Sequence, residues 1–122
     1  MSKNILVIED DSILQNNIKK ILEEEKFKVQ QIFDGEDAKQ AIKDQRPDLI
    51  LLDLMLPGLD GYHVLESLKE TGKTKDIPVI VLTVIGTENS IKECKMLGAD
   101  DYLVKADYTL AEVTKKVKKH LK

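Results

Sequence analysis

Short apolar segments recur along this chain at regular intervals, and they constrain its fold more than any other feature. Five have the length of β-strands, and several are apolar throughout, as is typical of strands covered on both faces. The five segments are residues 4–8, 28–32, 49–52, 78–83 and 101–104. Because the gaps between them show helical spacing of apolar residues, the pattern predicts an α/β fold with a parallel sheet and five helices distributed over both of its faces.

The boundaries of the predicted helices carry their own signals. Ser12 with Gln15, and Thr109 with Glu112, match the capping box that begins a helix, in which two side chains satisfy free backbone N–H groups. Gly98 stands where the fourth helix should end, since glycine readily adopts the left-handed conformation that closes many helices. These signals agree with the ranges that the apolar pattern indicates.

The length and composition exclude several classes of protein. At 122 residues, with 42% hydrophobic and 34% charged residues, we expect residues 1–122 to form a single globular domain. The 19 basic and 22 acidic residues give a net charge of -3, which predicts no direct nucleic-acid binding. The single cysteine, Cys94, and the lack of an apolar run of about 18 residues predict a cytoplasmic protein without a membrane span.

Four polar residues stand at the C-terminal ends of the apolar segments: Asp10, Asp53, Thr83 and Lys105. In an open parallel sheet the carboxyl ends of the strands share one edge, where ligands bind, so these side chains should lie close together. The carboxylates, with Glu9 beside Asp10, suit a hard divalent cation. The hydroxyl and the ammonium suit a phosphoryl group, and the set therefore predicts a site for both.

Each of these residues taken singly also has a structural explanation. Glu9 and Asp10 stand at the start of a predicted helix, where acidic residues favour the positive end of the helix dipole. Asp53 is compatible with a turn, Thr83 has the β-branched side chain that strands favour, and Lys105 is compatible with a solvated charge. The prediction of a site depends on their occurrence together at one edge.

The order and spacing of the motifs resemble the receiver domain of bacterial two-component response regulators. The resemblance spans essentially the whole chain and is carried by Glu9-Asp10, Asp53, Pro57-Gly58-Leu59-Asp60-Gly61, Thr83, Gly98-Ala99-Asp100-Asp101-Tyr102 and Lys105. It implies a flavodoxin-like, doubly wound sheet of five parallel strands in the order 2-1-3-4-5. In that order the first and third strands are neighbours, which places Asp10 beside Asp53.

The resemblance also implies roles for the residues of the predicted site. Asp53 corresponds to the phosphorylated aspartate, and Lys105 to the lysine that binds the phosphoryl group. Glu9, Asp10 and Asp53, with the backbone carbonyl of Met55, correspond to the ligands of Mg²⁺, which is the expected cofactor. The protein is therefore expected to be a switch that catalyses only its own phosphorylation and dephosphorylation, and not an enzyme acting on other substrates.

Two further residues correspond to the switch of that family. Thr83 resembles the switch hydroxyl, and Tyr102 the aromatic residue that changes rotamer when the threonine moves. The implied output is a change in the surface formed by the fourth helix, fifth strand and fifth helix. The expected partners are a sensor histidine kinase or histidine phosphotransfer protein and a downstream effector protein, with weak homodimerisation through the same face left open.

Several features differ from the family pattern or stand outside it. Residues 1–122 are expected to be a single receiver domain with no effector domain. Ala106 follows Lys105 where the family usually has proline, and Val84 follows Thr83 where a small residue is more common. We expect Val84 to narrow access to the phosphoryl site and to prolong the phosphorylated state. His63 and His120 are interpreted as surface residues. A receiver-like interaction module that is never phosphorylated is the alternative function.

Overall fold

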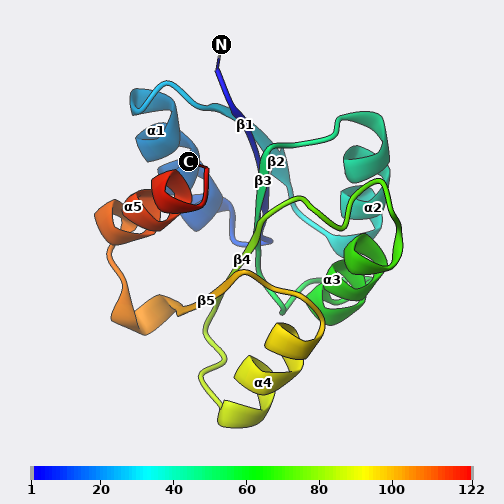
Figure 1. Ribbon diagram of the computed structural model, residues 1–122. Coiled ribbons are helices and arrows are strands. Elements are labelled where there is room, and N and C mark those ends of the chain that lie inside the picture. The colour runs from blue at the N-terminus through cyan, green and yellow to red at the C-terminus, as the bar shows by residue number, and fades with distance from the viewer. Residues whose placement is uncertain (1, 122) are drawn as a thin grey trace.

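Five parallel strands form a single sheet at the centre of the molecule, with helices on both faces (Figure 1). The computed structural model describes residues 2–121. The elements in chain order are β1 (Asn4–Ile8), α1 (Ser12–Glu24), β2 (Lys28–Ile32), α2 (Gly35–Asp44), β3 (Leu49–Leu52), α3 (Gly61–Glu70), β4 (Val79–Thr83), α4 (Glu88–Met96), β5 (Asp101–Val104), a 3-10 turn (Lys105–Asp107) and α5 (Leu110–His120). The strand order β2-β1-β3-β4-β5 confirms the predicted flavodoxin-like topology.

The sheet buries an apolar layer on each face, because successive side chains of a strand point to opposite sides. On one face, strand residues such as Ile5 and Leu51 pack against α1 and α5, which lie next to each other on the left of Figure 1. On the other face, residues such as Leu6 and Leu52 pack against α2, α3 and α4. The three central strands β1, β3 and β4 are therefore covered on both sides, which explains their uninterrupted apolar sequences. Within residues 2–121, no helix has the length and apolar character needed to span a membrane.

The strand register brings the predicted site residues to one edge. Ile8 of β1 is paired with Leu52 of β3, so the next residues along the two strands, Glu9 and Asp53, emerge side by side. The backbone N–H of Asp53 donates to the carbonyl of Ile8 at 2.9 Å, which continues the pairing into the loop. In the next two strands of the sheet, Thr83 of β4 is paired with Val104 of β5, and Lys105 directly follows Val104.

The helix ends agree with the sequence signals at some positions and not at others. The capping box of Thr109 and Glu112 is present at the start of α5, and Gly98 adopts a φ of +104° after α4, as predicted. The prediction that Ser12 caps α1 is wrong. The cap is Asp11, whose carboxylate accepts hydrogen bonds from the backbone N–H groups of residues 13 and 14.

Gln15 has a different role from the one predicted for it. Its side chain is buried, and its amide nitrogen lies within hydrogen-bond distance of the carbonyl oxygens of Val7, Glu9 and Ile32, at 2.8 to 3.2 Å. These carbonyls stand at the C-terminal ends of β1 and β2, where the ladder of the sheet stops. Gln15 therefore satisfies backbone groups beneath the predicted site, because its buried side chain is directed at the ends of the strands and not at the N-terminus of α1.

Candidate functional site

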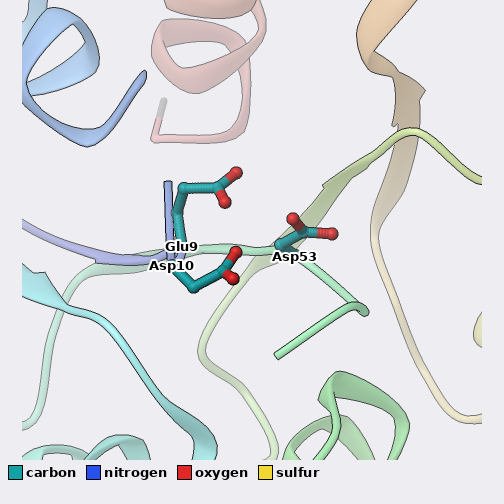
Figure 2. Close-up of side chains that lie close together, drawn as sticks. All are labelled: Glu9, Asp10 and Asp53. Atoms are coloured by element: carbon teal, nitrogen blue, oxygen red, sulfur yellow. The ribbon is translucent and has the colours of Figure 1, made fainter. Parts of the chain in front are cut away.

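Three carboxylates meet at the C-terminal edge of the sheet (Figure 2). Glu9 and Asp10 follow β1, and Asp53 follows β3. Each residue offers a carboxylate oxygen within 4.8 Å of those of the other two. Glu9 is 3% exposed and Asp53 4% exposed, whereas Asp10 is open to solvent. The predicted juxtaposition of Asp10 and Asp53 is thus confirmed.

The backbone around Asp53 is fixed by a close approach of α3. The N–H of Gly61, at the start of that helix, donates to the carbonyl of Leu54 at 3.0 Å. A Cβ at Gly61 would overlap the backbone carbonyl of Asp53, so only glycine allows the helix to begin there. The side chain of Asp60 caps the same helix by accepting from the N–H of His63. The loop that carries Asp53 is therefore anchored at both ends.

Lys105 connects the two buried carboxylates. Its Nζ lies 2.9 Å from Oδ2 of Asp53 and 2.5 Å from Oε1 of Glu9. Burial by itself would lower the pKa of this lysine, but the hydrogen bonds to Glu9 and Asp53 outweigh it and raise the pKa above its ordinary value. Lys105 therefore carries a positive charge directed at Asp53, as the resemblance to receiver domains implied.

Glu9 is the carboxylate whose acidity is most altered. Burial raises its pKa from 4.5 to about 7, and the negative charge of Asp53 acts in the same direction. The hydrogen bonds from Lys105 and from the backbone N–H of Asp11 act in the opposite direction but do not cancel the effect of burial. A further positive charge in the site would favour the ionised form of Glu9.

An open cavity of about 500 Å³ lies over these residues. The residues that line it follow the strands, and half of them are acidic: Glu9, Asp10, Asp11, Asp53, Leu54, Met55, Leu56, Asp60, Val84 and Lys105. Val84 is 61% exposed and lies at this cavity, so its side chain is not packed away against α4. Met55 lies at the cavity too, and its N–H donates to Oδ1 of Asp53 at 3.2 Å.

The three carboxylates fit a small divalent cation. Mg²⁺ takes oxygen ligands at about 2.1 Å in octahedral geometry, which places ligand atoms roughly 3 to 4.2 Å apart. Oxygens that already lie within 4.8 Å of one another need only a small approach to reach that spacing. The exposure of Asp10 leaves room for the water ligands that Mg²⁺ retains.

The two predicted switch residues lie beside the site and not in it. Thr83 is fully buried at the end of β4, and its hydroxyl accepts from the N–H of Ile85 at the long distance of 3.5 Å. Tyr102 points its hydroxyl at the carbonyl of Ile85, to which it donates at 2.6 Å. Both contacts therefore converge on the loop between β4 and α4.

Sequence reasoning missed two hydroxyl residues and misplaced a histidine. Ser90 and Tyr62 extend the contacts of Tyr102, and no pattern in the sequence indicated either of them. His120 was expected at the surface, but it is partly buried and its Nε2 lies 2.9 Å from Oδ2 of Asp101. Burial alone would raise the pKa of Asp101, whereas hydrogen bonds from His120 and from the backbone of Tyr102, with the charge of Lys116, hold it below its ordinary value.

Known proteins resemble this chain over its full length. The family model described as the response regulator receiver domain matches residues 5–118. The phosphate regulon transcriptional regulatory protein PhoB of Rhizobium meliloti (strain 1021) is 35% identical over 122 residues, which cover 100% of this chain and 53% of PhoB. PhoB of Escherichia coli (strain K12) is 38% identical over 105 residues, which cover 86% of this chain and 46% of PhoB. The chain thus spans about half the length of these curated relatives.

Another relative bears on the expectation that nucleic acid is not bound. The DNA-binding dual master transcriptional regulator RpaA of Synechocystis sp. is 41% identical over 101 residues, 83% of this chain and 42% of RpaA. Because relatives include a DNA-binding regulator, the predicted absence of nucleic-acid binding finds no support. Net charge alone was an inadequate basis for that prediction.

Solved structures give the same result. The receiver domain of the Francisella response regulator 1452 superposes with a TM-score of 0.90 at 30% identity, covering 98% of this chain and 97% of that one. The receiver domain of the sensor histidine kinase PA1611 from Pseudomonas aeruginosa PAO1, with magnesium coordinated in its active site cleft, has a TM-score of 0.88 at 29% identity, covering 99% and 98%. By its sequence, its topology and its acidic edge, this chain belongs to the family of response regulator receiver domains.

Proposed function

We propose that the protein is a signalling switch in which Asp53 accepts a phosphoryl group from a phosphohistidine of a sensor histidine kinase or a histidine phosphotransfer protein. One observation carries the proposal. The buried carboxylate of Asp53 has the ammonium of Lys105 at 2.9 Å and the carboxylate oxygens of Glu9 and Asp10 within 4.8 Å. This arrangement combines a nucleophile, a cation that offsets phosphoryl charge, and ligands for a divalent metal.

The transfer is a displacement at phosphorus. A carboxylate oxygen of Asp53 attacks the phosphorus atom, the bond from phosphorus to the imidazole nitrogen breaks, and its electron pair stays on the imidazole. Lys105 offsets the charge on the phosphoryl oxygens, because its Nζ already lies at hydrogen-bond distance from Asp53. Glu9 and Asp10, with Asp53 and the carbonyl of Met55, would hold Mg²⁺, which supplies charge neutralisation to the transferred oxygens when bound.

The response to phosphorylation would pass through Thr83 and Tyr102. Among residues 2–121, the hydroxyl of Thr83 has one hydrogen-bond contact, at 3.5 Å from the N–H of Ile85, so it is available to an acyl phosphate on the neighbouring strand end. A shift of Thr83 would move the loop at Ile85, to which Tyr102 is hydrogen-bonded. The surface of α4, β5 and α5 would then change, and a downstream effector protein would read it. Homodimerisation through that face stays a prediction.

A receiver-like interaction module that is never phosphorylated is the competing function. It would not require a metal site or a phosphate acceptor. Nothing in the site favours it, because the three carboxylates lie close together (Figure 2) and Nζ of Lys105 lies 2.9 Å from Oδ2 of Asp53. The two functions differ in whether Asp53 reacts.

Intact-mass measurement tests the proposal. With acetyl phosphate and Mg²⁺, the wild type should gain one phosphoryl group, and Asp53→Ala should gain none. Asp60→Asn is the matched control, because Asp60 lines the same cavity and asparagine can still cap α3. This control should be phosphorylated like the wild type. Equal phosphorylation of the wild type and Asp53→Ala would refute the assignment of the acceptor.

A further inference from the structure

Three hydroxyl groups from three different elements form a continuous chain beside the β4–α4 loop. Tyr62 is the second residue of α3, Ser90 the third of α4, and Tyr102 the second of β5. The hydroxyl of Tyr62 lies 2.7 Å from that of Ser90, which lies 2.8 Å from that of Tyr102. Tyr102 in turn donates to the carbonyl oxygen of Ile85 at 2.6 Å. We call Tyr62, Ser90 and Tyr102 the hydroxyl relay.

The direction of every hydrogen bond in the relay follows from the last one, in which Tyr102 donates to the carbonyl oxygen of Ile85. A hydroxyl has one hydrogen to donate, and a carbonyl oxygen can only accept. Because Tyr102 donates to Ile85, it must accept from Ser90, and Ser90 must then accept from Tyr62. Each hydrogen is used once, in the order Tyr62, Ser90, Tyr102, Ile85. Hydrogen bonds in such a series polarise and strengthen one another.

Ser90 is the member that both neighbours depend on. It is 4% exposed, and its backbone N–H donates to the hydroxyl of Thr87, which caps α4, so its position in the first turn is fixed. Removal of its hydroxyl would leave Tyr62 without its acceptor and Tyr102 without its donor. Burial raises the pKa of Tyr102, which keeps its hydroxyl protonated and able to donate.

The relay also connects two loops of the site. Tyr62 follows the loop that begins at Asp53, and Ile85 lies two residues after Thr83. We infer that Ser90 is a positioning residue for Tyr102, that Tyr62 acts on Tyr102 only through Ser90, and that the hydroxyl relay links the loop after Asp53 to the loop after Thr83. The assignment of Tyr102 as a switch rests on the proposed function; the relay itself does not.

Hydroxyl exchange in the protein without a phosphodonor measures the relay directly. The chain has three tyrosines, so tyrosine labelled with carbon-13 at the ζ position gives three signals, whose deuterium isotope shifts report the exchange of each hydroxyl hydrogen. In Ser90→Ala, hydrogen exchange at the hydroxyl of Tyr102 should accelerate about fivefold. This factor corresponds to the free energy that one hydrogen bond typically contributes to stability. Tyr108, which packs on the opposite face of the sheet, should not change.

A matched control and a double mutant separate the relay from a general loosening of the fold. Ser67→Ala removes a serine hydroxyl of α3 that donates to the carbonyl of Val64 in its own helix, so Tyr102 should exchange as in the wild type. Tyr62→Phe should accelerate exchange at Tyr102 in the wild-type background and have no further effect in Ser90→Ala.

Two results would overturn the inference. One is an unchanged exchange rate of Tyr102 in Ser90→Ala, which would mean that Ser90 does not support the ring. The other is an equal effect of Tyr62→Phe in both backgrounds, which would mean that Tyr62 reaches Tyr102 by another route. Neither result depends on Asp53 being phosphorylated, so failure of the relay and failure of the proposed function are distinguishable.

Discussion

Replacement of Lys105 by methionine tests how the acidic site is stabilised. The change removes the ammonium that lies 2.9 Å from Asp53 and leaves Glu9 and Asp53 buried as neighbouring carboxylates. Loss of one partner of a buried ion pair costs about 3–5 kcal/mol, whereas an exposed pair contributes about 0–1 kcal/mol. Lys105 is 19% exposed, and Glu9 can take up a proton to relieve the repulsion. We therefore expect a loss of about 2 kcal/mol at pH 7 in the absence of Mg²⁺.

Thermal and urea unfolding with a metal chelator measure this loss. For a domain of this size, about 2 kcal/mol corresponds to a fall in Tm of roughly 8 °C. Addition of Mg²⁺ should reduce the difference between Lys105→Met and the wild type to less than about 1 kcal/mol, because the metal then supplies the positive charge to both carboxylates. Lys20→Met is the matched control, since Lys20 is exposed on α1 and methionine keeps helix propensity.

Two outcomes would refute this reasoning. If Lys105→Met were as stable as Lys20→Met in the chelator, the two carboxylates would not depend on the lysine. If Mg²⁺ stabilised the wild type and Lys105→Met by the same amount, the metal would not replace the ammonium, and the charges of the site would not be coupled.

Three further predictions concern the metal, the rim of the cavity and the output surface. Asp10→Asn should weaken Mg²⁺ binding by more than about tenfold, measured from amide shifts near Asp53, because loss of a charged ligand costs at least as much as loss of an outer-shell partner. Val84→Ala should accelerate both phosphorylation by acetyl phosphate and hydrolysis, because Val84 lies exposed at the cavity. His120→Gln should raise the pKa of Asp101 in a carboxyl NMR titration. The pKa of Asp101 in the folded protein lies below the ordinary 3.8, so its contact with His120 contributes stability above pH 3.8. This stability is lost as the pH falls through the folded pKa. Acid unfolding should therefore begin at a higher pH in His120→Gln than in the wild type.

Each of these predictions has a result that contradicts it. Unchanged Mg²⁺ affinity in Asp10→Asn would remove that residue from the ligand set. A slower or unchanged rate of hydrolysis in Val84→Ala would show that the valine does not restrict access. An Asp101 titration that is identical in His120→Gln and the wild type would mean that the histidine does not stabilise the carboxylate.

The strands and most of the site could be predicted because they depend on patterns that few other structures produce. Continuous apolar runs indicate strands covered on both faces, and polar residues directly after such runs must emerge at one edge. Glu9, Asp10, Asp53 and Lys105 all follow this pattern, and the structure brings them together. Only the fourth strand was misjudged, by one residue, since Pro78 precedes β4.

The features that could not be predicted are a choice between two adjacent helix caps and side-chain contacts that form only when separate elements pack together. Asp11 and Ser12 are both good helix caps, and sequence alone could not choose between adjacent candidates. His120 looks like a surface residue at the end of a helix, and only the packing of α5 against β5 brings it to Asp101. Ser90 gives no signal at all, because its role depends on two tyrosines from other elements.

The arrangement of one ammonium among three carboxylates also decides what can approach the site. With Glu9 ionised, the carboxylates of Glu9, Asp10 and Asp53 and the ammonium of Lys105 carry three negative charges and one positive charge, a formal excess of two negative charges. A phosphoryl donor that arrives alone meets net repulsion, and a divalent cation cancels the excess. The site therefore discriminates by order of arrival, since the anion is repelled until the cation has bound. Without bound metal, higher ionic strength should screen this repulsion and favour the approach of an anionic donor, whereas with bound metal the dependence on ionic strength should be much weaker.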